Sequence, residues 1–79
     1  MDRSEILKQV NDIFINLLDV EELILSEKTT ADDVEDWDSL SHIQLVVAFE
    51  KHFKIRFTSR EIQSWKTIGE LINCIESKI

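Results

Sequence analysis

The feature of this sequence that most limits its fold is its shortage of turn-forming residues. The 79 residues include no proline and a single glycine, Gly69. Tight β-hairpins depend on glycine, asparagine and proline turns, so a sheet of many short strands would be hard to connect. A chain of this length also forms only one small domain with a thin core. The sequence therefore predicts an all-α fold, as a single domain over residues 1–79.

Hydrophobic spacing predicts where the first helix lies. Apolar residues recur at helical intervals from Ile6 to Leu18, and Asp2 with Glu5 resembles an N-terminal capping pair. The pattern fades at Asp19, and residues 19–37 show no clear period. A loop this long is uncommon in a compact domain. We expect it to be held by four buried apolar anchors: Leu23, Ile24, Leu25 and Val34.

Capping signals predict the remaining helices. Asp38 is a carboxylate N-cap for a second helix, and residues 58–61 and 67–70 are both Thr-x-x-Glu capping boxes. The first box opens a short helix that ends near Trp65, and the second opens the last helix. The expected core residues of the second and last helices are Leu45, Val46, Phe49, Phe53, Ile68, Leu71, Ile72, Ile75 and Ile79. Together these patterns predict a small four-helix bundle of three longer helices and one short helix, with a long loop between the first and second helices.

The charge of the chain limits its partners. Sixteen Asp and Glu against nine Lys and Arg give a formal charge of −7. So acidic a chain is poorly suited to nucleic-acid phosphates or to anionic membrane surfaces, and it favours basic protein partners. The sequence has no run of 18 apolar residues for membrane insertion, and its start lacks the pattern of a signal peptide. We therefore expect a cytoplasmic monomer.

One serine is placed where a modification would be stabilised. Ser39 follows Asp38 in the first turn of the predicted second helix, directly after the acidic loop. The N-terminus of a helix offers free N–H groups and a positive partial charge, which stabilise a phosphate ester. The residues alone leave a second interpretation open, in which Asp38 and Ser39 merely cap the helix.

The stretch D-W-D-S-L-S-H-I-Q-L-V-V-A-F-E-K-H-F-K-I resembles the acyl carrier protein family, as does T-I-G-E-L-I at residues 67–72. The similarity extends over nearly the whole chain. It implies that Ser39 receives 4′-phosphopantetheine from a phosphopantetheinyl transferase, and that the thiol of this arm carries an acyl group as a thioester. A chain of this kind is not an enzyme, because the cofactor supplies the reactive group.

The resemblance also implies how partners recognise the chain. Asp38 would be the acidic residue next to Ser39 that the modifying enzyme recognises. Leu40, Val47 and Glu50 would lie on the partner-facing side of the helix. The implied partners are the transferase, an acyl-loading ligase or synthase, and downstream acyltransferases with basic surfaces.

Departures from the family pattern leave alternatives open. Gln44 and Lys51 stand where many members carry acids, which dilutes the acidic face. A tryptophan before the last helix, here Trp65, resembles the D-alanyl carrier branch of the family. That branch has Asp-Ser-Met at the motif, however, whereas this chain has leucine at position 40. A D-alanyl or other aminoacyl carrier therefore remains an alternative. So does a different class of protein, an unmodified acidic helical adaptor that binds a basic partner.

Two enzyme-like or metal-binding interpretations have less support. Ser39 with His42 could suggest a hydrolase, but no glycine forms a strained turn at the serine, and we expect His42 to be a partly buried packing residue. An EF-hand that began at Asp32 would place Val34 and Trp37 at ligand and glycine positions. We therefore expect no metal, but a solvated acidic surface formed by Asp32, Asp33, Glu35, Asp36 and Asp38.

Three further residues are expected to serve packing. Cys74 cannot form an intramolecular disulfide, and it lies between Ile72 and Ile75, where a free cysteine behaves as a small hydrophobe. Trp37 and Trp65 flank predicted helix boundaries and are expected to pack against the bundle.

Overall fold

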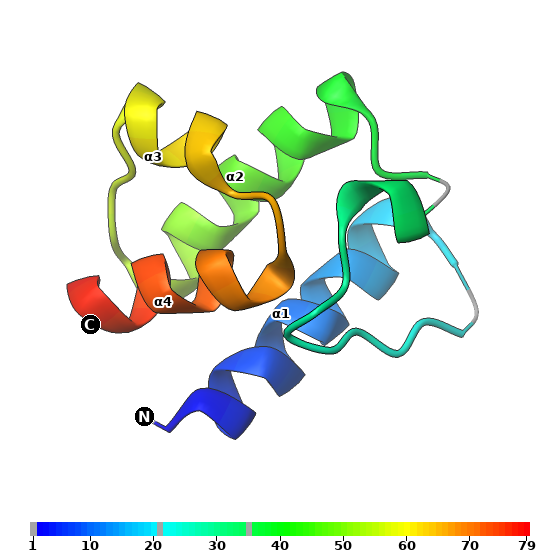
Figure 1. Cartoon of the computed structure of the whole chain (residues 1–79), viewed down its shortest axis with the longest axis horizontal. Helices are drawn as coiled ribbons and strands as arrows, with labels where there is room; N and C mark the ends of the chain where they lie inside the picture. Colours follow the sequence, from blue (N-terminus) through cyan, green and yellow to red (C-terminus); the bar gives the residue numbers. More distant parts are fainter. Residues whose placement is uncertain (1, 21, 35) are drawn as a thin grey trace.

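The computed structural model describes residues 2–20, 22–34 and 36–79, so Glu21 and Glu35 of the acidic stretch lie outside the described residues. It contains four α-helices: α1 (Arg3–Leu18), α2 (Ser39–Phe53), α3 (Ser59–Ser64) and α4 (Ile68–Lys78). Helix α1 packs against α2 and α4, and the short α3 lies beside α2 (Figure 1). The predicted four-helix architecture is confirmed, including its order and its long first loop. One element was not predicted, a single 3₁₀ turn, η1 (Ala31–Asp33), within that loop.

Capping residues set the helix ends where the sequence predicts them. The Asp2 carboxylate accepts a hydrogen bond from the Glu5 N–H at 3.0 Å. Helix α1 ends where Asp19 adopts a left-handed conformation with φ of 54°. At the starts of α3 and α4, the Thr58 and Thr67 hydroxyls accept from the third N–H of their helices, at 3.1 and 3.2 Å. These contacts satisfy donors that a helix start otherwise leaves unpaired.

The core combines residues from three helices and the loop. Phe14 of α1 lies at its centre, with its ring 5.1 Å from that of Trp37 and 6.0 Å from that of Phe49. The expected core residues of α2 and α4 are all buried except Ile79, which is half-exposed at the end of the chain. Among the described residues, the buried hydrophobic residues are Ile6, Val10, Phe14, Leu25, Val34, Trp37, Leu45, Val46, Phe49, Phe53, Ile68, Leu71, Ile72 and Ile75.

The loop anchors are mostly where the sequence predicts them. Leu25 and Val34 are buried and Leu23 is partly buried against the core, but Ile24 is 94% exposed. The prediction for Ile24 is wrong because successive side chains of an extended segment point to opposite sides. Leu23 and Leu25 face the core together, so Ile24 between them faces the solvent.

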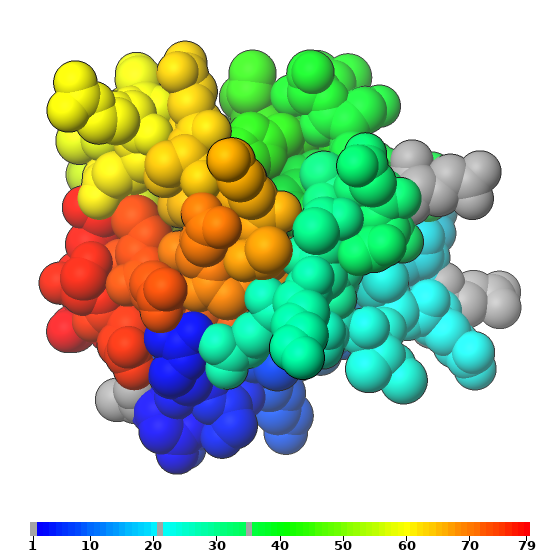
Figure 2. Space-filling model, viewed as in Figure 1, coloured from blue at the N-terminus to red at the C-terminus, as the bar shows by residue number. Residues whose placement is uncertain are grey.

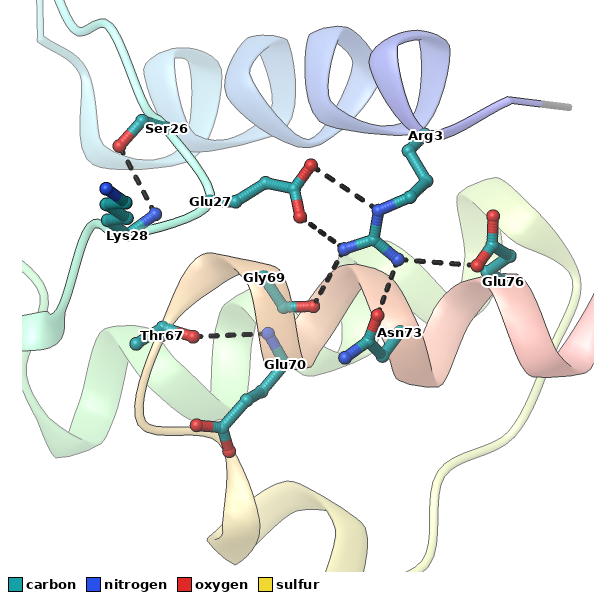
Figure 3. Close-up of polar contacts among 9 residues, drawn as sticks. All are labelled: Arg3, Ser26, Glu27, Lys28, Thr67, Gly69, Glu70, Asn73 and Glu76. Carbon is teal, nitrogen blue, oxygen red and sulfur yellow. Dashed lines mark hydrogen bonds and ion pairs between the residues drawn. The ribbon is translucent and has the colours of Figure 1, made fainter.

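Polar contacts attach the loop to the starts of α1 and α4 (Figure 3). The N–H groups of Ile68 and Gly69 donate to the carbonyls of Thr29 and Glu27, at 2.9 and 2.8 Å. Arg3 bonds to the Glu27 carboxylate and lies 3.3 Å from a carboxylate oxygen of Glu76. Figures 1 and 2 show residues 27–30 between the beginnings of α1 and α4. Residues 27–29 are therefore held against α1 and α4, and the rest of the loop runs from this attachment to the start of α2.

Among the described helices, none combines the length and the apolar character that crossing a bilayer requires.

Candidate functional site

Two serines at the start of α2 have different environments. Ser39 is the first residue of the helix and is exposed, whereas Ser41 is buried. The Ser41 hydroxyl accepts from the Asp38 N–H at 2.8 Å and donates to the Asp36 carbonyl at 2.9 Å. The Asp38 carboxylate in turn accepts from the Ser41 N–H at 2.9 Å. This capping box fixes the loop–helix junction through Ser41 and leaves Ser39 on the surface.

The residue before Ser39 carries a stable negative charge. The hydrogen bond from the Ser41 backbone N–H, helped by the Ser41 side chain, holds the pKa of the Asp38 carboxyl below its usual value. A helix N-terminus stabilises an anion in the same way. Asp38 is thus ionised at neutral pH and directly precedes Ser39 in the chain.

A histidine joins the loop, α2 and α3 beside Ser39. The ring of His42 lies between those of Trp37 and Trp65, with centroids 5.9 and 5.7 Å away. His42 Nδ1 accepts from the Trp37 indole N–H at 3.1 Å. Because an indole only donates, the imidazole proton is on Nε2, which donates to the Ile62 carbonyl at 3.2 Å. Both ring nitrogens of His42 are engaged in hydrogen bonds, so neither acts as a base for Ser39. The prediction that His42 is a partly buried packing residue is confirmed.

A recess of about 590 Å³ opens beside Ser39, between α2 and α3. Its walls are mainly aromatic and aliphatic, and it also touches Asp38 and Ser39. A group attached to Ser39 would therefore have apolar surface within reach. The walls are formed by Trp37, His42, Ile43, Ile62 and Trp65, with contributions from Ala31 and Gln63.

An apolar surface runs along the exposed side of α2 from Ser39. We call Leu40, Ile43 and Val47 the α2 ridge; their exposed fractions are 69, 62 and 44%. Residues three, four and seven apart share one face of a helix. Leu40 and Val47 are predicted from the sequence to lie on the partner-facing side of the helix. Ile43 is not among the predicted residues, although it lies three positions after Leu40 and therefore on the same face.

Glu50 lies one turn beyond the α2 ridge in a mixed environment. It is half-buried, and its Oε2 accepts from the Phe57 N–H at 2.9 Å. Glu50 also lines a groove shared with Val47. Part of the charge expected to face partners is therefore used to stabilise the connection between α2 and α3.

The other polar candidates are the acidic residues before α2 and the thiol of Cys74. No three His, Cys, Asp or Glu side chains of the described residues are grouped closely enough to hold a metal ion. The half-buried Cys74 donates to a Glu61 carboxylate oxygen at 3.4 Å. Burial, followed by this contact, raises the pKa of the Cys74 thiol, which keeps it protonated and unreactive at neutral pH.

Comparison with known proteins gives one consistent result. Residues 8–75 match the family model described as "Phosphopantetheine attachment site". The chain is 31% identical over 80 residues to an acyl carrier protein of Thermosynechococcus vestitus, covering all of this chain and 98% of the relative. It is 33% identical to an acyl carrier protein of Caulobacter vibrioides, covering 95 and 96% of the two chains.

A solved structure supports the same relationship. The solution NMR structure of the holo acyl carrier protein from Geobacter metallireducens matches with a TM-score of 0.85 and 38% identity, covering 91% of this chain and 83% of that one. The chain therefore belongs to the phosphopantetheine attachment-site family, and it acts as an acyl carrier that depends on 4′-phosphopantetheine and is not itself an enzyme.

Proposed function

We propose that 4′-phosphopantetheine is attached to the hydroxyl of Ser39. The observation that carries this proposal is an exposed serine at the first position of a long helix, directly after an ionised carboxylate. Ser41 is unsuited, because its hydroxyl is buried and bonded within the capping box. At Ser39 the helix N-terminus would stabilise the negative phosphodiester, and the exposed position would admit a transferase.

The attachment reaction needs only the serine and coenzyme A in a phosphopantetheinyl transferase. The Ser39 oxygen attacks the pantetheine-bearing phosphorus, the transferase takes up the hydroxyl proton, and adenosine 3′,5′-bisphosphate leaves. The thiol of the attached arm then carries the acyl group as a thioester. Because coenzyme A supplies the arm, we also propose a cytoplasmic location.

The rest of the site supports the handling of the arm. The recess beside Ser39 offers Trp37, His42 and Trp65 as surfaces against which part of the arm or its cargo packs. Asp38, Leu40 and Val47 are exposed and would contact the transferase, the loading ligase or synthase, and later acyltransferases. Glu50 contributes there through the part of its carboxylate that is not bonded to Phe57.

The test is intact mass after incubation with a phosphopantetheinyl transferase of broad specificity and coenzyme A. The wild-type chain should gain one phosphopantetheine arm, and S39A should gain none. The matched control is S59A, which removes the other exposed serine at the first position of a helix and should load as the wild type does. V47D should stay folded by circular dichroism but load about tenfold more slowly, since it places a charge in an apolar contact.

An unchanged wild-type mass would contradict the proposal and support the unmodified adaptor. Loading of S39A would move the attachment point to another residue. An unfolded V47D would show that Val47 belongs to the core rather than to the partner surface.

A further inference from the structure

The end of the α2 ridge farthest from Ser39 is basic. Val47 lines a groove of about 300 Å³ together with Glu50, Lys51, Ile55 and Arg56. Both cations are exposed, and neither lies within 4.0 Å of a carboxylate of any residue that the structure describes. Glu50 is the one carboxylate among the groove residues, and its Oε2 already accepts from the Phe57 N–H. The groove therefore has an excess of positive charge available to a partner.

The end of the α2 ridge nearest Ser39 has the opposite charge. Exposed carboxylates lie in the turn η1 and in the residues that lead into the helix. From Asp38 to Lys51 the helix rises about 20 Å, at about 1.5 Å per residue. The apolar side chains of the α2 ridge lie between these two ends. The exposed acidic residues are Asp32, Asp33, Asp36 and Asp38.

We propose that the α2 ridge docks on proteins whose surface is basic where the arm enters and carries a carboxylate roughly 20 Å away, opposite Lys51 and Arg56. The proposal rests on the proposed function in one respect, namely that the arm is attached at Ser39. Opposite charges at the two ends set the direction of docking, because the reversed orientation brings like charges together. A partner with a uniformly basic surface is disfavoured by Lys51 and Arg56, so the same groove gives specificity.

The experiment measures binding rather than acyl transfer. The probe is an acyltransferase whose docking surface has been mapped structurally and is basic throughout. A second form of the probe has glutamate in place of the basic residue that faces the distal end of the carrier helix. Binding of the unloaded chain is followed by fluorescence anisotropy at low and at high salt, so the result does not depend on whether Ser39 accepts the arm.

The matched variants separate local from overall charge. K51E/R56E changes the groove, while K28E/K66E makes the same charge change at exposed lysines that do not line the groove. We expect K51E/R56E to bind the basic probe about tenfold more tightly than the wild type does, and K28E/K66E to change binding by less than about threefold. The glutamate form of the probe should instead prefer the wild type to K51E/R56E by about tenfold. Both differences should shrink at high salt, because salt screens exposed charges.

Several results would overturn the proposal. One is that K28E/K66E binds the basic probe as much more tightly as K51E/R56E does, and another is that K51E/R56E does not bind it more tightly than the wild type. A third is that the glutamate form of the probe binds the wild type and K51E/R56E equally. Binding of the wild type, but not of K51E/R56E, to phosphatidylglycerol vesicles would assign the groove to lipid headgroups instead of a protein. If K51E/R56E loses helix content, the neutral pair K51Q/R56Q is used and should give a smaller gain in the same direction. Failure of Ser39 loading in the mass assay would contradict only the attachment proposal.

Discussion

At the scale of single residues, two serines two positions apart have opposite roles. The sequence could place Ser39 at the start of a helix, because an N-cap carboxylate before an apolar period is a local signal. It could not show that Ser41 closes the capping box from the third helical position, where glutamate is usual. That role depends on the path of the loop, since the Ser41 hydroxyl also bonds to the Asp36 carbonyl. Burial of the second serine was therefore visible only in the structure.

Gly69 is another residue whose role comes from a contact distant in sequence. A Cβ at this position would lie 2.9 Å from the Glu27 carbonyl oxygen and 3.3 Å from the Glu27 Cβ. Alanine is favoured over glycine in a helix by about 1 kcal/mol, but here the clash is with backbone. We expect G69A to destabilise the protein by roughly 1–3 kcal/mol, as overpacking does, measured by urea unfolding.

The control for Gly69 is S77A, at an exposed position on the same helix, which removes only a hydroxyl that donates to the Cys74 carbonyl one turn back at 2.7 Å. S77A should be neutral or slightly stabilising because alanine has the higher helix propensity. A G69A variant as stable as the wild type would show that residues 27–30 move away from α4 without cost.

At the scale of elements, helix boundaries were predictable and the loop was not. Caps such as Asp2, Thr58 and Thr67 act within three residues, so the sequence contains them completely. The side on which Ile24 points, and the existence of η1, depend on where the loop meets α4. The hydrogen bond that the Glu50 carboxylate accepts from the Phe57 N–H depends in the same way on the position of Phe57. The sequence therefore predicts where α2 begins, but not the contacts that bury Ser41 and engage the Glu50 carboxylate.

The contact between α3 and α4 gives a prediction about pH. Hydrogen bonds from the Thr58 N–H, then from Lys78 and Cys74, lower the pKa of the Glu61 carboxyl from 4.5 to about 2. A carboxyl whose pKa is lower in the folded state stabilises the fold above its unfolded pKa, and this contribution is lost as the pH falls through the folded value. We expect the contribution of Glu61 to be complete above pH 4.5 and to disappear toward pH 2.

Urea unfolding measured between pH 7 and pH 2 tests this expectation with E61Q. The variant should be less stable than the wild type at pH 7, and the difference should narrow as the pH falls through that window. E22Q removes an exposed carboxylate outside the α3–α4 contact and controls for the change in net charge. A constant difference between E61Q and the wild type at every pH would mean that the amide loses packing or geometry rather than charge.

At the scale of the whole molecule, Arg3 connects the beginning of the chain with its middle and its end. Its guanidinium bonds to the Glu27 carboxylate in the loop, to the Asn73 side chain and to Glu76 in α4 (Figure 3). The Glu27 contact raises the pKa of Arg3, and Arg3 lowers that of Glu27. These residues are separated by 24 to 73 positions in sequence. No local pattern predicts the network, because each pair exists only once the bundle has closed.

The exposure of its charged side chains decides how much the Arg3 network contributes to the stability of the fold. About a third of the Arg3 side chain and nearly half of each glutamate partner are accessible, so solvent and salt screen the charges. R3Q should therefore lower the midpoint of urea unfolding at low ionic strength, and the difference should decrease in about 1 M salt. R60Q, which removes an exposed arginine outside this network, controls for the change in net charge. Arg3 also donates to the Gly69 carbonyl at 3.4 Å. If R3Q lost the same stability at both salt concentrations, the hydrogen bonds of Arg3 to Asn73 and to the Gly69 carbonyl would contribute more than its ion pairs. In that case hydrogen bonds rather than charge would attach the loop to α4, and ionic strength would not change the position at which α2 begins.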